Sequence, residues 1–250
     1  MKIKKILISQ PKPENGKSPY YDVAEKYNVK VDFRPFIKVE AMSSREFRDQ
    51  KVNIADFSAV VFTSRTGADH FFRICEEMRV KLTENIKYFC TSEAIGFYLQ
   101  KYVNFKKRKV YNSPSSKLAD LFVLMNKHAS ENYLFVLSEN NNEEIFALLK
   151  TAKFRYKTAF MYRSVSNEFT ENEEFDYDML IFFSPQGIVS LLKNFPNYQQ
   201  GETYIGCLGA TAAAAVRNAG FRVNLEVPNP QFSSLSMALD DFIKQNHKKR

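Results

Sequence analysis

The sequence has no long apolar run and little glycine or proline. Its uncharged apolar stretches, such as Met179 to Ser184, are far shorter than the roughly 18 residues that a membrane-crossing helix needs. Only 8 Gly and 9 Pro occur among 250 residues, which excludes collagen-like and broadly disordered chains. The remaining composition, 44% hydrophobic and 26% charged, is that of a globular protein, and the length favours two lobes.

Cysteine and histidine are scarce, with three of each. Cys75, Cys90 and Cys207 are widely spaced and form no CxxC pair, so the sequence predicts no structural zinc and a reducing, cytoplasmic location. The basic start, Met1 to Lys5, is followed by too few apolar residues for a signal peptide. We expect a buried first strand there instead.

Motifs that carry common chemistry are absent as well. Without GxGxxG or GxxxxGK(S/T), no nucleotide cofactor is expected. The sequence also has no GxSxG and no HExxH, and no motif organises its histidines into a catalytic set.

The net charge of +8 raises the question of a nucleic-acid partner. Part of the excess lies in Lys106–Lys109 and in the terminal Lys248–Arg250. Neither run is interleaved with aromatics, and no zinc-finger or RNA-binding signature occurs, so we expect no nucleic-acid partner. A small polyanionic ligand explains the charge equally well.

Short apolar, β-rich runs alternate with stretches of helical period, which is typical of βα units around parallel sheets. The fold class is therefore predicted to be α/β. The predicted strands are Ile3–Ser9, Ala59–Thr63, Lys87–Cys90, Tyr133–Ser138, Asp178–Phe183, Thr203–Gly206 and Arg222–Leu225. The predicted helices are Tyr20–Tyr27, Thr66–Met78, Glu93–Tyr102, Ser116–Lys127, Asn142–Lys150, Gln186–Asn194, Thr211–Asn218 and Ser233–Gln245.

Two further segments, Lys30–Glu40 and Lys153–Ser166, are longer, aromatic and mixed in polarity. We expect them to form long extended strands that cross together between two lobes.

A self-comparison supports two lobes of similar plan. Val60–Gly67 aligns without gaps on Leu180–Gly187, at an offset of 184 − 64 = 120. Cys90–Ala94 lies over Gly209–Ala213 at nearly the same offset, 209 − 90 = 119. Two blocks that keep their spacing indicate a duplicated unit, with the middle half of the chain inside the outer half.

Polar residues follow the duplicated strands. Thr63-Ser64 and Ser184-Pro185-Gln186 end predicted strands and open helices, where free N–H groups attract carboxylates and phosphates. Gly209 to Thr211 begins a helix of very small residues, and a start of this type allows an anion to approach the backbone N–H groups closely. Helix capping explains the serines as well, so both interpretations stay open.

Tyr162 lies in the second crossing segment. Its phenol could face a cleft between the lobes and donate a proton there. A purely structural tyrosine is an equally open interpretation.

The chain resembles the uroporphyrinogen-III synthase family over essentially its whole length. The resemblance is carried, in order, by Ser9–Pro11, Val60–Ser64, Phe160–Arg163, Ile181–Pro185, Gly209–Ala213 and Pro228–Pro230. It implies two Rossmann-like, parallel-sheet lobes joined by a two-stranded β-ribbon. We place lobe 1 in residues 1–33 and 167–250, the crossing strands in 34–41 and 156–166, and lobe 2 in 42–155.

The resemblance also implies an activity in tetrapyrrole and haem biosynthesis. Members of the family are lyases without metal or organic cofactor. They bind linear hydroxymethylbilane in the inter-lobe cleft, remove its terminal hydroxyl as water and close the macrocycle with ring D inverted, through a spiro intermediate. The substrate carries eight carboxylates, which suits donors at helix starts and a basic protein. Positioning the substrate is then the main task.

By family position, Tyr162 is the residue implied to assist loss of the hydroxyl. The residues implied to bind substrate are Thr63, Ser64, Thr91, Ser92, Ser184, Pro185, Gln186, Gly209, Thr211 and Gln10.

Three positions depart from the family pattern. Gln10 stands where many relatives have arginine, and Glu93 stands at a threonine position. Since a carboxylate repels an octa-anion, Thr91 or Ser92 takes over this contact, or the loop does not touch substrate. Ser138–Asn140 replaces an Arg-Gly pair.

The alternative is a non-catalytic, two-lobed binding module for a polyanionic small molecule. Such a module would need an export signal or an attached output domain, and the chain offers neither. We therefore expect a cytoplasmic, monomeric enzyme with no membrane partner and with transient contact to the preceding enzyme of the pathway.

Overall fold

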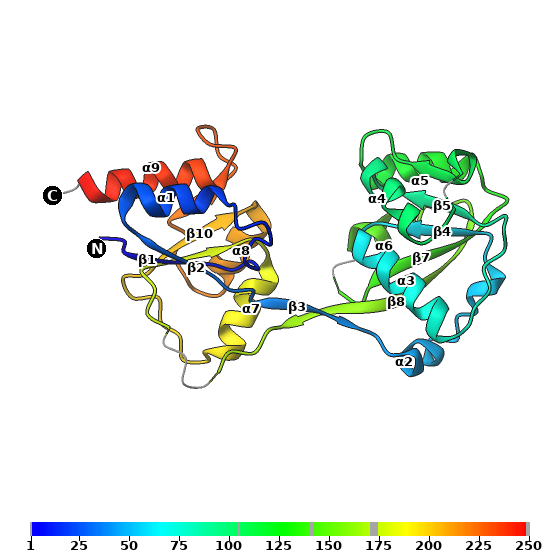
Figure 1. The fold of residues 1–250 in the computed structure, drawn as a ribbon, viewed down its shortest axis with the longest axis horizontal. Coiled ribbons are helices and arrows are strands. Elements are labelled where there is room, and N and C mark those ends of the chain that lie inside the picture. The colour runs from blue at the N-terminus through cyan, green and yellow to red at the C-terminus, as the bar shows by residue number, and fades with distance from the viewer. Residues whose placement is uncertain (1, 105, 141–142, 171–174, 249–250) are drawn as a thin grey trace. The chain divides into compact units, whose positions relative to one another are not determined.

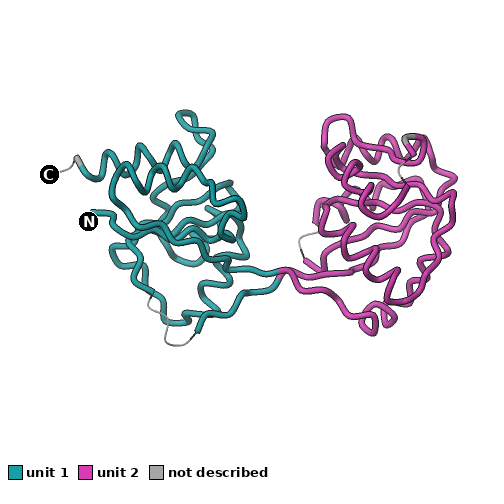
Figure 2. The backbone as a smooth tube through the Cα atoms, in the orientation of Figure 1, with its two compact units in different colours: residues 1–38, 165–250 teal, residues 39–164 magenta. Residues whose placement is uncertain are grey.

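The computed structural model consists of two compact units. Unit 1 combines residues 1–38 with 165–250, and unit 2 is the continuous segment 39–164 (Figure 2). The described residues are 2–104, 106–140, 143–170 and 175–248. No helix in this described part is long and apolar enough to span a membrane.

Unit 1 contains a parallel five-stranded sheet in the order β11-β10-β9-β1-β2. Its strands are β1 (Lys5–Ile8), β2 (Lys30–Phe33), β9 (Met179–Phe182), β10 (Tyr204–Leu208) and β11 (Leu225–Val227). Its helices are α1 (Pro19–Tyr27), α7 (Pro185–Asn194), α8 (Ala210–Asn218) and α9 (Leu235–Lys248) (Figure 1).

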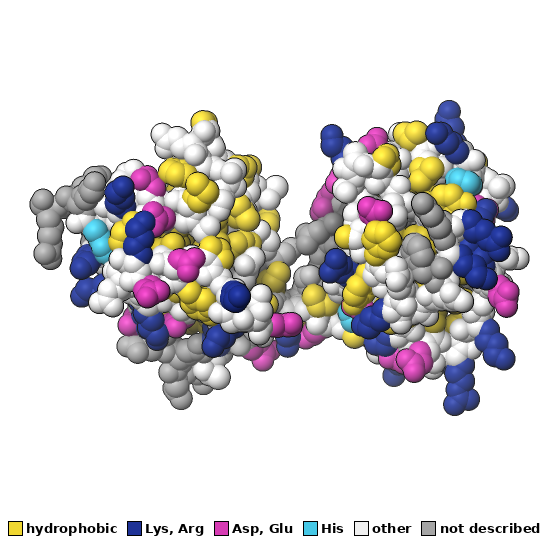
Figure 3. Space-filling view, turned by 45° about the horizontal axis from the view of Figure 1, so that its top comes forward, with side chains coloured by type: hydrophobic (Ala, Val, Ile, Leu, Met, Phe, Trp, Pro, Cys, Tyr) yellow, Lys and Arg dark blue, Asp and Glu magenta, His cyan; other side chains and the backbone are white. Residues whose placement is uncertain are grey.

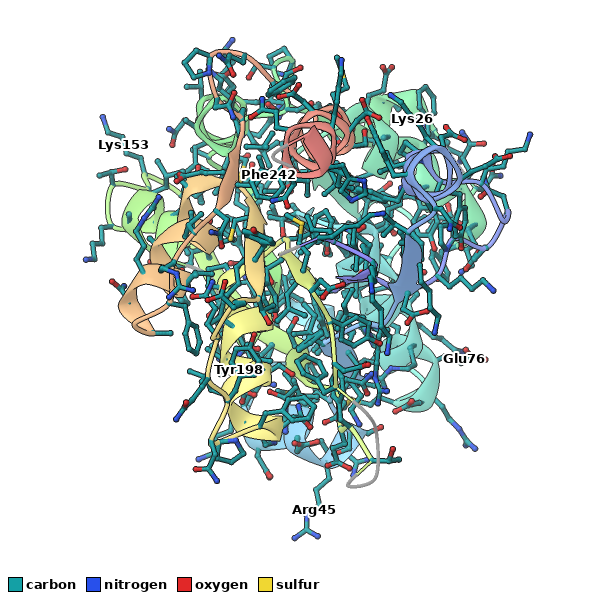
Figure 4. The ribbon with its side chains drawn as sticks, turned by 90° about the vertical axis from the view of Figure 1, so that its left-hand side faces the viewer. Lys26, Arg45, Glu76, Lys153, Tyr198 and Phe242 are labelled. Carbon is teal, nitrogen blue, oxygen red and sulfur yellow. The ribbon has the colours of Figure 1, made fainter. Side chains whose placement is uncertain are left out.

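Two apolar clusters fix these helices to the sheet. Helices α1 and α9 share one cluster with β1 and β11, and α7 and α8 share the other with β9 and β10. Phe242 points from α9 toward the sheet (Figure 4), where its ring meets Tyr204 at 5.3 Å. Each helix buries one apolar stripe, as an amphipathic helix on a sheet must.

Unit 2 contains a six-stranded sheet in the order β3-β8-β7-β4-β5-β6. Its strands are β3 (Ile37–Ala41), β4 (Ala59–Phe62), β5 (Lys87–Cys90), β6 (Val110–Asn112), β7 (Asn132–Ser138) and β8 (Arg155–Ser166). Its α-helices are α2 (Ser44–Asp49), α3 (Arg65–Glu77), α4 (Glu93–Tyr98), α5 (Leu118–Asn126) and α6 (Glu143–Leu149), with short 3₁₀ turns at Ile54–Asp56, Leu99–Lys101 and Lys107–Lys109. Helices α2, α3 and α4 pack on one face, and α5 and α6 pack on the other.

The predicted α/β class is confirmed, and the two sheets follow the same plan. The order β11-β10-β9-β1-β2 matches β6-β5-β4-β7-β8, so β9 and β4 take equivalent central places. Ser184 and Ser64 cap the helices that follow these strands, as the first aligned block predicts. The second block is displaced by two residues, because Gly209 is the cap equivalent to Ser92, at an offset of 209 − 92 = 117 instead of 119. The strand ends account for one residue, since 208 − 90 = 118, and Thr91 accounts for the other, since it separates β5 from its cap whereas no residue separates β10 from its own.

The expectation of one long strand over Lys30–Glu40 is wrong. Strand β2 ends at Phe33 within the sheet of unit 1, and a new strand, β3, begins at Ile37 and pairs with β8. Pro35 explains the break, since it has no N–H for a ladder and a fixed φ. The N–H of Met42 donates to Met161 O (3.0 Å) and that of Asn167 donates to Phe36 O (2.7 Å), so β3 and β8 run antiparallel.

The predicted strand Arg222–Leu225 is also misplaced, because β11 covers Leu225–Val227. The N–H of Arg222 is taken by Gln200 Oε1 at 2.7 Å rather than by a neighbouring strand. The buried residues of this segment are Leu225 and Val227. Strand β6 and helix α2 are not predicted from the sequence.

Candidate functional site

The polar residues of unit 2 lie beyond the carboxyl ends of β4 and β5. Because these strands are parallel neighbours, Thr63-Ser64 and Thr91-Ser92 meet at one edge of the sheet. Ser64 Oγ accepts the Gly67 N–H at 2.9 Å, and Ser92 Oγ accepts the Ile95 N–H at 3.4 Å. Both serines are therefore helix caps, which the simpler interpretation predicted for Ser64.

Beside them lies a hollow of about 540 Å³. It is lined by Thr63 and Thr91, by Ser116 and Lys117 before α5, and by Glu144 of α6 among others. Thr91 Oγ1 donates to Thr63 O at 3.4 Å, which holds the two loops together. Hydroxyls and one cation give this hollow donors for an anion, and Glu144 places a carboxylate in the same wall.

Tyr162 reaches this edge through an irregularity in β8. Leu137 pairs with Phe160, but the next residue, Ser138, pairs with Tyr162, so Met161 is an extra residue, a β-bulge. Neighbouring side chains of a strand normally point to opposite faces. Here Met161 and Tyr162 both join the apolar cluster on the α3 face, because the bulge turns the phenol toward α3.

The phenol of Tyr162 is held on two sides. Its hydroxyl lies 3.0 Å from Ser64 Oγ, in a hydrogen bond in which either atom could be the donor. The ring of His70 stacks on the ring of Tyr162, with centroids 5.2 Å apart and planes at 17°. Only 8% of Tyr162 is exposed, so the ring is fixed inside unit 2.

His70 is kept neutral by its surroundings. Burial lowers the pKa of His70, and the nearby Arg73 guanidinium lowers it further, while Asp69 acts in the opposite direction. Arg73 Nε donates to His70 Nδ1 at 3.3 Å, so the neutral ring carries its proton on Nε2. From the sequence, His70 is expected to be a surface or half-buried histidine on a helix rather than a catalytic residue, and Arg73 is not singled out. Their three-residue spacing on α3 from Gly67 places them on the helix face that carries the Ser64 cap.

The strand beyond Tyr162 is tied down by residues at positions that depart from the family pattern. Arg163 forms ion pairs with Glu46 and with Glu139, the latter at 3.0 Å. Asn140 Oδ1 accepts the N–H of Ser164 at 3.0 Å. Glu139 and Asn140 thus hold β8. Glu93 is exposed at the first residue of α4, where the helix dipole favours a carboxylate.

In unit 1 the predicted residues also gather at the carboxyl ends of parallel strands. Gln10 follows β1, Ser184-Pro185-Gln186 follow β9, and Gly209 to Thr211 follow β10. Ser184 makes no side-chain cap bond, unlike Ser64. Gly209 has φ +93°, a conformation that favours glycine, and its N–H donates to Val227 O at 2.6 Å. Gln10 and Thr211 are exposed.

A second hollow of unit 2, about 680 Å³, lies toward the amino ends of β5 and β6. Phe72, Tyr88 and Tyr102 contribute its aromatic lining, and Arg79 and Lys81 are among its basic residues. In the view of Figure 3, Lys and Arg side chains gather on the right-hand side of unit 2 and are scattered over unit 1. Of the predicted basic runs, Lys106 and Lys109 line this hollow, whereas residues 249–250 lie outside the described residues. Among the residues described, no three His, Cys, Asp or Glu side chains form a metal-binding group.

The fold and the site together define a two-unit α/β protein whose polar residues lie beyond the carboxyl ends of parallel strands. A family model described as uroporphyrinogen-III synthase HemD matches residues 19–236. The chain therefore belongs to the uroporphyrinogen-III synthase family, and its main function lies in haem biosynthesis.

Solved structures agree on the fold. The uroporphyrinogen-III synthetase of Helicobacter pylori 26695 is 15% identical, with a TM-score of 0.61 over 97% of this chain and 100% of that one. A mutant uroporphyrinogen III synthase of the extremely thermophilic bacterium Thermus thermophilus is 14% identical, with a TM-score of 0.56 over 99% of this chain and 100% of that one. A search of curated proteins finds no significant match.

Proposed function

We propose that this chain is the lyase that converts hydroxymethylbilane to uroporphyrinogen III, with loss of water and inversion of ring D. The observation that carries the proposal is Tyr162, a phenol held at the carboxyl edge of a parallel sheet between a serine hydroxyl and a neutral imidazole. Loss of a hydroxyl as water needs a proton donor, and general acids contribute about 10²- to 10⁴-fold to such steps.

Tyr162 is assigned the role of acid. Its phenol gives a proton to the terminal hydroxyl of the bilane, the C–O bond breaks with its electron pair, and water leaves. The adjacent pyrrole nitrogen supplies electrons to the methylene carbon, and ring D attacks that carbon through the ring carbon that already carries the methylene bridge to ring C, which gives the spiro intermediate. The bond from that ring D carbon to the ring C bridge then breaks, with the ring C nitrogen supplying electrons to the released bridge carbon. Ring D turns over, and its other, unsubstituted α carbon attacks the bridge carbon and loses its proton. Once ring D has closed and lost its proton, the phenolate takes a proton back, so no other reagent is consumed.

Binding is assigned to the edges of both sheets. Thr63, Thr91 and Ser92 in unit 2 offer hydroxyls and helix N–H groups to the substrate carboxylates. Gln10, Ser184, Gln186 and Thr211 are assigned the same task in unit 1. Pro185 and Gly209 are assigned to shape the starts of α7 and α8 that face the substrate. The protein's positive net charge supports the capture of a polyanion. A monomer in the cytoplasm, with transient contact to the preceding enzyme, completes the proposal.

The test is the isomer composition of the product. Purified protein is added to freshly generated hydroxymethylbilane without cofactor, the products are oxidised, and the type I and type III uroporphyrins are separated. Predominantly type III supports the proposal, because the uncatalysed reaction gives type I.

Heat-denatured protein is the control for the spontaneous reaction. Type I alone, from protein shown to be folded by circular dichroism, would sink the proposal. Binding of the bilane without turnover would then favour the two-lobed binding module.

A further inference from the structure

Three serines occupy the N-cap positions of helices at the carboxyl ends of parallel strands, with almost the same backbone geometry. Ser64, Ser92 and Ser184 have φ of −153°, −149° and −155°, and each has ψ of 157°. Of these three described residues, Ser64 is the one whose hydroxyl also contacts a phenol, at 3.0 Å from Tyr162. The same backbone arrangement therefore occurs three times, and at Ser64 the serine hydroxyl has Tyr162 as an additional partner.

The direction of this hydrogen bond follows from the cap. Ser64 Oγ already accepts the N–H of Gly67 at the positive end of α3. A hydroxyl that accepts one hydrogen bond becomes a better donor for the next, because the two bonds polarise each other. This polarisation favours the arrangement in which the Ser64 O–H donates to the phenol oxygen of Tyr162.

Two other features prevent the phenol from leaving this contact. The bulge at Met161 turns Tyr162 toward α3, and His70 stacks on the ring. With its oxygen accepting from Ser64, Tyr162 has its own proton free for another acceptor. When that proton leaves, the donor to the phenolate is already in place and nothing has to reorganise.

We propose that Ser64 is a positioning residue for Tyr162, whose hydroxyl donates to the phenol oxygen and directs the phenol proton toward the departing hydroxyl of the substrate. This inference rests on the proposed function. It reassigns Ser64 from substrate binding, because its hydroxyl is occupied by Gly67 and Tyr162.

The experiment compares Ser64→Gly, Ser64→Ala and Ser64→Thr, each alone and combined with Tyr162→Phe. Glycine is tolerated at helix caps nearly as well as serine, so Ser64→Gly removes the hydroxyl without unfolding α3. We expect kcat to fall about tenfold in the Gly and Ala variants with little change in KM, as expected for one lost hydrogen bond to the reacting group. Threonine restores the hydroxyl and should rescue kcat.

The double variants are decisive. If Ser64 acts through Tyr162, adding Ser64→Gly to Tyr162→Phe lowers kcat no further. The matched control is Ser92→Gly, which removes a cap without a phenol partner, and whose effect should be unchanged by Tyr162→Phe. If the double variant instead shows a loss of kcat equal to the product of the two single losses, the inference is overturned and Ser64 is a helix cap alone.

A spectroscopic readout separates this inference from the proposed function. With tyrosine labelled at Cζ with ¹³C, the Tyr162 signal is assigned by its absence in Tyr162→Phe. We expect Ser64→Gly to shift this signal and Ser92→Gly to leave it in place. An unmoved signal in Ser64→Gly would contradict the inference even in an active enzyme. A shifted signal in a protein that forms only type I would support the hydrogen bond from Ser64 to Tyr162 and would sink the proposed function, and with it the catalytic role of that bond.

Discussion

Ser64 and Ser184 occupy the same place in the two units, yet their surroundings differ. Each caps the helix that follows the central strand of its sheet. Ser64 bonds to Gly67 and Tyr162, whereas the Ser184 side chain makes no cap bond. The shared fold thus supplies the same helix start twice, and only unit 2 adds, among the described residues, a phenol bonded to the capping serine.

The presence of a phenol beside Ser64 but not beside Ser184 originates in β8 of unit 2 and β2 of unit 1, which occupy the same place in the order of their sheets. Strand β8 has 12 residues and a bulge that presents Tyr162, while β2 has four residues. Arg34 follows β2 and lies over the ring of Phe169, 3.8 Å from its centroid. On the proposed function, unit 1 holds carboxylates, and unit 2 holds carboxylates and also delivers the proton.

The units also anchor the crossing strands differently. In unit 1, Asn194 Nδ2 donates to Asn167 O at 2.9 Å and its Oδ1 accepts the Phe169 N–H at 3.0 Å. Ser190 Oγ of the same helix donates to Phe36 O. In unit 2, Gln50 makes two bonds to Phe160, at 2.7 and 2.9 Å. Helix α7 therefore connects the Ser184 loop to the crossing strands, whereas in unit 2 this anchor comes from the residue that follows α2.

The largest expected effect comes from removing the hydroxyl of Tyr162, the feature that distinguishes the Ser64 site of unit 2 from the Ser184 site of unit 1. Tyr162→Phe should lower kcat about 10- to 100-fold with the fold intact, since the ring and its stacking remain and only the acid is lost. Steady-state formation of type III isomer measures it. Tyr156→Phe, on the same strand, is the matched control and should leave turnover unchanged. Unchanged turnover in Tyr162→Phe would remove this tyrosine from the mechanism.

The equivalent position in unit 1 should respond differently, and Ser184→Ala should change KM more than kcat.

The next effect sharpens the difference between the anchors. Asn194→Ala should lower the local opening free energy of residues 167–169, and Gln50→Ala should lower that around Phe160, each by about 2 kcal/mol, because each substitution removes two hydrogen bonds that count roughly 1 kcal/mol apiece. Amide hydrogen exchange reads the two segments separately. Gln245→Ala, which loses only a surface contact, is the control. If either substitution left the protection of its own segment unchanged, or lowered that of the other segment equally, the assigned roles would be contradicted.

The regular parts of both units could be predicted from sequence. Lys87–Cys90 was predicted with the bounds of β5 because an apolar run there is enclosed by polar residues. Helix α2 was missed because it has only six residues, although Ser43 and Glu46 form a capping box that is visible in the sequence. Pro35 likewise marks the end of β2 before β3 begins.

The arrangement around Tyr162 could not be predicted, because the bulge depends on the register of β8 against β7. Ser64 and Tyr162 are 98 positions apart, and no local pattern joins them. His70 lies on α3 where only the packed structure shows its ring on the phenol. Sequence identified the residue types at strand ends, and tertiary structure decided which of them meet.

A smaller effect tests why the imidazole beside Tyr162 is neutral. The pKa of His70 is lowered in the fold by burial and by Arg73, so its contribution to stability is present above the unfolded value of about 6.5 and lost as the pH falls below it. His70→Phe keeps a stacked ring that cannot titrate. The urea midpoint of the wild type should therefore fall relative to that of His70→Phe between pH 8 and pH 5. A constant difference between the two midpoints would show that His70 titrates as it does in the unfolded chain.

The smallest effect concerns the contact that fixes the end of β8. Hydrogen bonds from the side chain and N–H of Ser43, and then from Arg163, lower the pKa of Glu46 to about 2. Because this folded value lies below the unfolded one of about 4.3, the stabilisation is complete above pH 4.3 and disappears as the pH falls toward 2. Glu46→Gln should therefore lower the urea midpoint slightly at pH 6 and make progressively less difference below pH 4. Arg163→Met is the matched control: the pH-dependent gap between Glu and Gln at position 46 should shrink in that background but persist, because Ser43 is the larger cause. A gap of equal size at pH 6 and pH 3 would show that the carboxylate charge has no part in holding α2 against β8.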